Sequence, residues 1–257
     1  MGYYGLTKSE RAVVAQEILK TIAEDLKVNS LDRIKFCYAD DDTYIRKNAY
    51  LATGKLYAGF TELKVPVLAM LHSLFTDEDF RIRQTVINAA GEIGKKEFDV
   101  VRCFFDDGLS DPHHSPRNAV IGSMKKISRV NPDPLLLWAK TYLHHPEKEI
   151  RREICHGIEL RGRTHPQDIL PLLRELQFDQ TLRVRRTLVH VIGQISYKKG
   201  CLQVVVQEIK KWQDKELISE AFKEIIDVHH RYRNFATLTQ EQAMQYIAAC
   251  SDLSVSL

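Results

Sequence analysis

The sequence lacks the features of a membrane protein and of a disulfide-rich secreted protein. No stretch approaches the roughly 18 consecutive apolar residues of a membrane span, and no basic segment followed by an apolar run marks a secretory signal near the start. The five cysteines are scattered and never form a Cys-x-x-Cys pair, which argues against a disulfide framework and for reduced thiols. We therefore expect a cytoplasmic protein with no membrane association.

Motifs that carry enzyme chemistry are also missing. The sequence has no phosphate-binding glycine loop, no Gly-x-Ser-x-Gly and no His-Glu-x-x-His, the patterns of nucleotide binding, serine hydrolysis and zinc-dependent proteolysis. Adjacent histidines occur at 113–114, 144–145 and 229–230, but neighbours in sequence point apart on a helix and lack the spacing of zinc ligands. The sequence therefore predicts no catalytic residue, no metal site, no cofactor and no small-molecule substrate.

An arginine recurs through the middle of the chain at an almost fixed interval. Its five copies are 37, 34, 34 and 34 residues apart, and each follows an apolar residue or a proline. An aspartate stands six residues before the arginine, except in the fourth copy, where His145 stands there. The members of this pattern are Asp40, Arg46, Asp77, Arg83, Asp111, Arg117, Arg151, Asp179 and Arg185. A period of this length indicates stacked supersecondary units.

Apolar residues follow each arginine at offsets 3, 7 and 10, which lie on one face of a helix. In the second copy these residues are Val86, Ala90 and Ile93. A second apolar segment precedes each such helix, and the turns between the two are short enough only for antiparallel neighbours. The sequence thus predicts an all-α protein built from helix pairs.

We expect these pairs to form a single solenoid over residues 1–257, because each unit buries its apolar face only against its neighbours. Residues 1–30 would supply an N-terminal capping helix, and residues 31–230 would hold the repeats. Residues 231–257 would form a C-terminal cap and a frayed tail.

Two segments carry a resemblance to a known family. DEDFRIRQTVINAAGEIG at 77–94 and DQTLRVRRTLVHVIGQIS at 179–196 resemble bacterial-type HEAT repeats, and the similarity extends over roughly residues 31–230. This resemblance implies a right-handed α-α superhelix, a HEAT-like solenoid of about six helix pairs. It also implies that these aspartates and arginines are structural and link neighbouring repeats in a buried or half-buried ladder. We expect each arginine to pair with the aspartate six residues before it, except Arg151, where His145 interrupts the pattern.

Residues 143–200 are also similar to the HEAT-like DNA alkylation repair glycosylases, which grip DNA in a basic concave face. This similarity implies DNA binding as an alternative, and an alkylpurine DNA glycosylase-like activity if the chain is an enzyme. A Trp-x-x-x-Asp arrangement is absent, however, because Tyr142 and Glu216 stand four residues after Trp138 and Trp212. The catalytic residues of that family therefore find no match, and we expect a protein that is not an enzyme.

The face opposite the apolar one is basic. At offsets 1, 5, 9 and 12 from the arginine, eight of 20 residues are Lys or Arg and one is acidic, although the chain has 37 basic and 34 acidic residues. In a solenoid of helix pairs this face is expected to line the concave side and to bind a partner. The predicted binding face comprises Lys47, Lys55, Lys95, Asn118, Lys126, Arg129, Arg152, His156, Arg163, Arg186, His190 and Tyr197.

A basic face attracts a partner of opposite charge. An acidic protein segment is the expected partner, which makes the chain a recognition or scaffold module. A nucleic-acid backbone is the alternative, and steeply salt-dependent binding would distinguish it. A solvated helix face that is basic by chance is the third interpretation.

Overall fold

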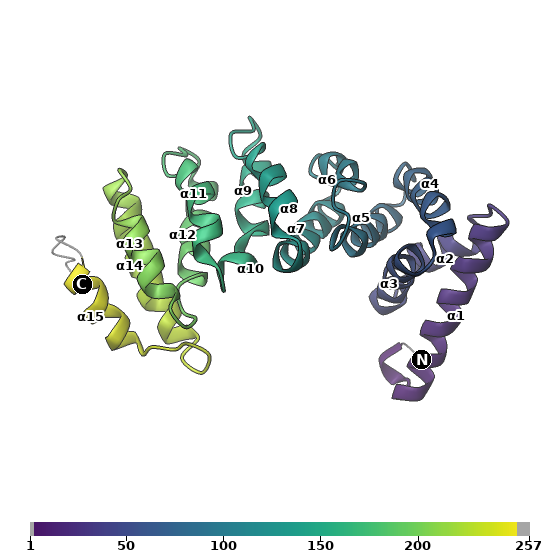
Figure 1. Cartoon of the computed structure of the whole chain (residues 1–257), viewed down its shortest axis with the longest axis horizontal. Helices are drawn as coiled ribbons and strands as arrows, with labels where there is room; N and C mark the ends of the chain where they lie inside the picture. The colour runs from purple at the N-terminus through teal and green to yellow at the C-terminus, as the bar shows by residue number, and fades with distance from the viewer. Residues whose placement is uncertain (1–2, 251–257) are drawn as a thin grey trace. The chain divides into compact units, whose positions relative to one another are not determined.

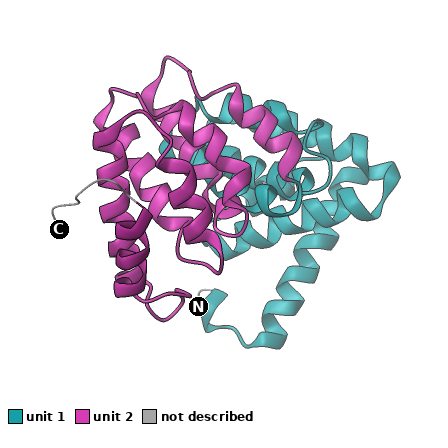
Figure 2. Cartoon of the chain, turned by 60° about the vertical axis from the view of Figure 1, so that its left-hand side comes forward, with its two compact units in different colours: residues 1–131 teal, residues 132–257 magenta. Residues whose placement is uncertain are grey.

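The computed structural model describes residues 3–250, and every regular element in that range is helical (Figure 1). This confirms the prediction of an all-α protein. The chain forms two compact units, residues 1–131 and 132–257 (Figure 2). Within the described range, no helix combines the length and the apolar character needed to cross a membrane.

Unit 1 contains three helix pairs in its described part. Their second helices, α3, α5 and α7, pack side by side in that order; α1 packs on α3, and α2, α4 and α6 pack on the second helix of their own pair. The elements are η1 (Tyr3–Gly5), α1 (Lys8–Lys27), α2 (Asp32–Ala39), α3 (Thr43–Gly59), η2 (Thr61–Leu63), α4 (Lys64–Phe75), α5 (Phe80–Gly94), α6 (Arg102–Gly108) and α7 (His114–Val130).

Unit 2 repeats the arrangement in its described part. Its second helices, α9, α12 and α14, also pack side by side in that order, while α11 packs on α13, and α15 packs on α13 and α14. The elements are α8 (Pro132–Lys140), α9 (Lys148–Gly157), α10 (Glu159–Gly162), α11 (Pro166–Glu175), α12 (Leu182–Gln194), α13 (Cys201–Ile209), α14 (Lys215–Arg231) and α15 (Gln240–Cys250).

The residues at the predicted apolar offsets lie in the core. Val86 and Ala90 are fully buried, and Ile93 is 3% exposed. The fourth copy differs, because its second helix is interrupted: α9 ends at Gly157 and the short α10 follows it. Arg161 stands at a core offset there, and its guanidinium pairs with Asp168 Oδ2 at 2.7 Å instead of entering the core.

Both terminal helices begin with reciprocal caps. The Thr7 side chain accepts the backbone N–H of Glu10, and the Glu10 carboxylate accepts the backbone N–H of Thr7 at 2.7 Å. Thr239 and Gln242 make the same exchange before α15. These caps fix the starts of α1 and α15. The frayed tail expected at 251–257 lies outside the described residues.

All five cysteines are free thiols, and Cys155 and Cys201 are buried. The cytoplasmic location and the single solenoid over residues 1–257 stay predictions.

Candidate binding face and polar cluster

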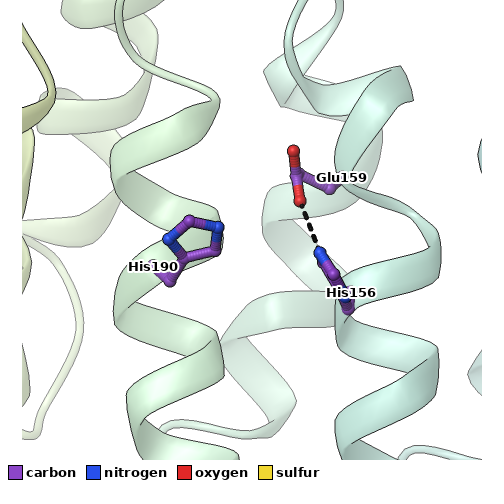
Figure 3. Close-up of side chains that lie close together, drawn as sticks. All are labelled: His156, Glu159 and His190. Carbon is purple, nitrogen blue, oxygen red and sulfur yellow. Dashed lines mark ion pairs between the residues drawn. The ribbon is translucent and has the colours of Figure 1, made fainter. Parts of the chain in front are cut away.

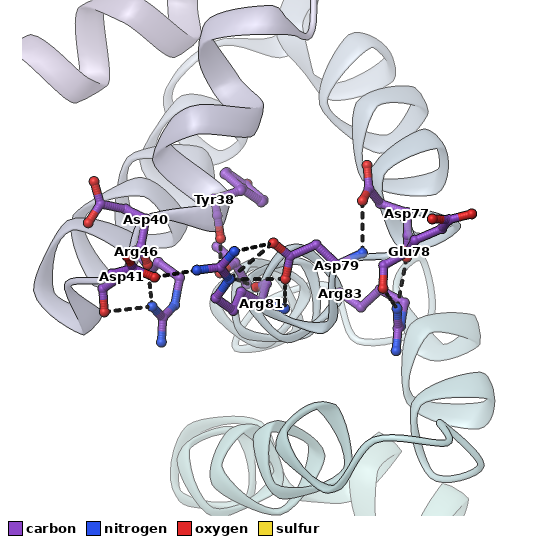
Figure 4. A network of polar contacts seen from close by, with 10 residues as sticks. Tyr38, Asp40, Asp41, Arg46, Asp77, Glu78, Asp79, Arg81 and Arg83 are labelled. Carbon is purple, nitrogen blue, oxygen red and sulfur yellow. Dashed lines mark hydrogen bonds and ion pairs between the residues drawn. The ribbon is translucent and has the colours of Figure 1, made fainter.

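The arginines that recur about every 34 residues are called marker arginines below. Three of them, Arg83, Arg151 and Arg185, join one repeat to the next. Arg83 donates from Nε and Nη2 to the carboxylate oxygens of Asp111 at 2.7 and 3.0 Å. Its Nη1 donates to the backbone carbonyls of Asp77 and Glu78 at 2.8 and 2.9 Å (Figure 4). One guanidinium therefore ties the turn of its own repeat to the turn of the following repeat.

The same arrangement recurs in unit 2. Arg151 donates to the carboxylate of Asp179 at 2.6 and 3.2 Å and to the backbone carbonyl of His145 at 2.8 Å. Arg185 donates to Asp214 Oδ2 at 2.5 Å. The carboxylate partner thus lies 28 or 29 residues after the arginine. The predicted pairing with the aspartate side chain six residues before the arginine was wrong for Arg83, because Asp77 offers its backbone carbonyl instead.

The position of the aspartate in the turn explains this difference. Asp111 Oδ1 accepts the backbone N–H of His113 at 2.8 Å, which fixes the carboxylate at the start of the second helix, where the arginine of the preceding repeat reaches it. His145 supports its own turn in a similar way, since its Nδ1 accepts the backbone N–H of Glu147 at 3.1 Å. A histidine can therefore replace the aspartate in the turn, but it lacks the carboxylate.

Two arginines of unit 1 keep the backbone contact. Arg46 donates to the carbonyl of Asp40, and Arg117 donates to the carbonyl of Asp111 at 2.5 Å. Asp77, the next aspartate of the repeat pattern after Arg46, pairs at 2.9 Å with Lys35 of α2. At the first repeat junction, Lys35 and not Arg46 therefore pairs with the aspartate side chain of the next repeat.

Low pH should weaken the arginine–aspartate pairs between repeats and so lower the free energy of unfolding. Burial alone would raise the pKa of Asp111, but the Arg83 guanidinium and the His113 backbone N–H outweigh it and hold that pKa below its usual value. Its stabilising effect is fully present above the unfolded-state pKa, about 3.9, and is lost as the pH falls through the lower folded-state pKa. Urea unfolding from about pH 7 to about pH 3 should show a smaller loss of stability for Asp111→Asn than for the wild type. Equal losses would contradict this assignment.

The basic face of unit 1 consists of predicted cationic positions on α3 and α7 and at the C-terminal end of α5, namely Lys47, Lys55, Lys95, Lys126 and Arg129. Lys47, Lys55 and Arg129 are exposed, as is the neighbouring Asn118. Lys95 and Lys126 are half-buried and pair with Glu92, the one acidic residue at these offsets. The Lys126 ammonium also lies 5.0 Å from the centre of the Tyr50 ring. Side chains of all three helices therefore meet on this face, and cations exceed carboxylates.

A hollow of about 260 Å³ opens between α3 and α5 on this face. Its lining includes the rings of Tyr44 and Tyr50, the ammonium-bearing Lys47 and the amides of Gln84 and Asn88. Rings, a cation and amides together can hold an apolar group beside a hydrogen-bonding or anionic one.

The corresponding positions of unit 2 are largely charge-compensated. Arg152 pairs with Glu149 at 2.8 Å and with the buried Glu153 at 3.4 Å. Arg163 pairs at 2.5 Å with Glu159, which is 1% exposed. These glutamates do not stand at offsets 1, 5, 9 or 12 from the marker arginine, so the charge count on the predicted face did not include them. Of the predicted cations in unit 2, Arg186 is exposed, whereas Arg152 and Arg163 are half-buried.

Tyr197 does not belong to a solvated face. It is 4% exposed, and its ring stacks on that of Tyr232 with centroids 5.2 Å apart and planes 7° apart. The Lys198 ammonium lies 4.9 Å from the centre of the same ring. The stacking of these two rings, which follow the ends of α12 and α14, therefore explains why this predicted position is covered.

A polar cluster brings together His156, Glu159 and His190, whose ligand atoms all lie within 4.8 Å of one another (Figure 3). His156 Nε2 is 3.1 Å from Glu159 Oε2, and the ring centroids of His156 and His190 are 6.2 Å apart. Each histidine stands five residues after the marker arginine of its repeat, so the sequence already indicated that the two occupy equivalent positions in neighbouring repeats. Glu159 was missed as a third member because the core pattern gave it no role.

The two tryptophans are core residues. Trp138 is 5% exposed and Trp212 is 1% exposed. They support the first helices of unit 2 and present no ring to a ligand.

Two solved structures have the same fold. AlkD2 from Streptococcus mutans matches with a TM-score of 0.55 at 14% sequence identity, over 81% of this chain and 97% of that chain. The smu.31 protein of Streptococcus mutans UA159 matches with a TM-score of 0.51 at 16% identity, over the same shares of 81% and 97%. The sequence matches no protein-family model and no curated protein. The repeated helix pairs, the arginine ladder between them and these structural matches together show that the chain has the HEAT-like repeat fold.

Proposed function

We propose that the chain is a non-enzymatic recognition module whose basic face in unit 1 binds an acidic segment of a protein partner. The observation that carries this proposal is the excess of cations on that face. Five Lys and Arg residues stand there with one carboxylate, that of Glu92. A single-sign patch of this kind attracts an acidic partner and raises the rate of encounter.

The hollow between α3 and α5 favours a protein segment over a rigid duplex. An extended segment can insert a side chain between Tyr44 and Tyr50 while the carboxylates of that segment pair with Lys47 and the other cations of the face. Packed helices are about 10 Å apart, so the face spans about 20 Å across α3, α5 and α7. An extended segment of about six residues covers that distance.

Duplex DNA is the second candidate. The similarity of residues 143–200 to the HEAT-like DNA alkylation repair glycosylases favours it, and the cations of three successive helices suit a phosphate backbone. Against it, two arginines of that segment, Arg152 and Arg163, are compensated by Glu153 and Glu159. The buried Trp138 and Trp212 give no support to base excision.

The test compares binding by the wild type with that by a Lys47→Glu/Lys55→Glu/Arg129→Glu variant. The bait is the full chain, and the lysate is treated with nuclease before affinity capture. Three charge reversals at exposed sites should cost about 2 kcal/mol of binding free energy, or roughly a 30-fold loss of affinity. A partner that the wild type retains should therefore be lost from the variant.

A matched control reverses three exposed charges on first helices or their ends, Arg102, Arg174 and Lys210. This control should retain the same partner as the wild type. Equal capture by both triple variants would contradict a role for the basic face.

Fluorescence anisotropy with a duplex of about 20 base pairs tests the second candidate. Binding that falls steeply with salt and disappears in the unit 1 variant would favour DNA as the partner. An absence of DNA binding at low salt would eliminate it.

A further inference from the structure

His156, Glu159 and His190 come from three separate elements of unit 2. His156 lies on α9, Glu159 begins α10 and His190 lies on α12. The side chains of His156 and His190 are 32% and 42% exposed, whereas that of Glu159 is 1% exposed. The cluster therefore has a buried carboxylate as its base and two imidazoles open to solvent.

The position of Glu159 in its repeat explains why its side chain points at α12. It stands eight residues after the marker arginine, where three other repeats have Gly54, Gly91 and Gly193. At those glycines the next second helix is so close that an added Cβ would meet one of its side chains. A glutamate at this position must therefore place its carboxylate between α10 and α12, where a charge is costly without partners.

The partners of Glu159 leave one oxygen directed at the histidines. Arg163 Nη2 donates to Oε1 at 2.5 Å, while Oε2 lies 3.1 Å from His156 Nε2. A neutral imidazole has the lone pair that a metal ion needs.

A second carboxylate, that of Glu224 on α14, lies beside His190 but outside the group of three. Glu224 Oε1 is 3.7 Å from His190 Nδ1, and Arg231 holds the same oxygen at 2.5 Å. Gly193 makes room for this glutamate, since a Cβ at that position would lie 2.6 Å from Glu224 Cγ. The glycine one turn after His190 thus lets Glu224 lie against α12 beside the cluster.

We propose that His156, Glu159 and His190 bind one divalent transition-metal ion of the Zn²⁺ class, and that Glu224 orients His190 from outside the ligand shell. Two imidazoles and a carboxylate suit Zn²⁺, whereas Mg²⁺ and Ca²⁺ prefer oxygen ligands alone. Zn²⁺ binds such donors at about 2.0–2.2 Å, so tetrahedral donors lie about 3.4 Å apart. The three donor atoms, now within 4.8 Å, reach that spacing through modest side-chain rotations. Arg163 and Arg231 would orient the two carboxylates from outside the metal's ligand shell.

The test is titration of the chelator-treated full chain with Zn²⁺ by calorimetry, and with Co²⁺ by visible absorption. One ion per chain is expected. His156→Ala/His190→Ala should weaken binding about 100-fold or more, and Glu224→Gln should weaken it about 10-fold. The matched control, His144→Ala/His165→Ala, removes two exposed histidines that lie outside the cluster and should bind like the wild type.

A second readout needs no substitution. Zn²⁺ should protect His156 and His190 from modification by diethyl pyrocarbonate, as read by mass spectrometry, while His144 and His165 remain reactive. Three results would overturn the proposal: no Zn²⁺ binding by the wild type, equal affinity in the His156→Ala/His190→Ala chain, or thiolate charge-transfer bands in the Co²⁺ spectrum. The last result would assign the ion to cysteine.

Discussion

An Arg151→Ala chain should be about 3 kcal/mol less stable to unfolding than the wild type. The Arg151 side chain is 16% exposed and that of Asp179 is 6% exposed. The substitution therefore leaves a buried carboxylate without its cation, which costs more than removing both charges. It also removes the donor to the backbone carbonyls of His145 and Pro146. Urea unfolding at neutral pH, followed by circular dichroism, measures the loss.

Three variants separate the buried charge from the other effects of this substitution. Arg151→Lys keeps the charge but loses the two-pronged geometry, and should cost about 1–2 kcal/mol. Arg151→Ala/Asp179→Ala should be more stable than Arg151→Ala, because the unpaired carboxylate is gone. Arg186→Ala, at an exposed position, should change stability by less than about 0.5 kcal/mol. A double variant no more stable than Arg151→Ala would contradict the charge pair between repeats.

The helix pairs could be predicted from the sequence because burial follows from helical periodicity. A residue such as Val86 or Ile192 lies at a core offset, and any stacked neighbour will cover it. The carboxylate partner of each arginine could not be predicted in the same way. For Arg83, Asp77 six residues before it and Asp111 28 residues after it both lie in turns at the same end of the helix pairs. Only the packing of one second helix on the next decides between them.

The charge of the predicted binding face depended on residues outside the chosen offsets. Glu153 and Glu159 stand two and eight residues after Arg151, next to positions that were counted. Long side chains reach across that distance, so these acids pair with Arg152 and Arg163. The corresponding positions of α3, α5 and α7 hold no acid, and the cations of unit 1 therefore keep their excess. A count along one face describes charge well only where the flanking positions are neutral.

Gly91→Ala should destabilise the chain by about 1–3 kcal/mol. Gly91 lies on α5 where α7 approaches closely, and an added Cβ would be 2.7 Å from Ser123 Cβ and 3.5 Å from Ser123 Cα. Ser123 is fully buried, so α7 itself must move to admit the methyl group. The reverse is expected for Gly122→Ala on α7, because nothing lies within 4 Å of a Cβ at that position. That variant should gain about 0.5–1 kcal/mol from the lower entropy of its unfolded chain.

The same glycine-to-alanine change should thus have opposite signs on two helices that pack together. A double-mutant cycle with Ser123→Gly tests the cause, because that change removes the Cβ that the new methyl group meets. Gly91→Ala should cost about 1–2 kcal/mol less in the Ser123→Gly background than in the wild type. Urea unfolding of the four chains gives this coupling energy. Additive effects would show that the helix contact at Gly91 does not set the cost, and that the approach of α5 to α7 tolerates a side chain after all.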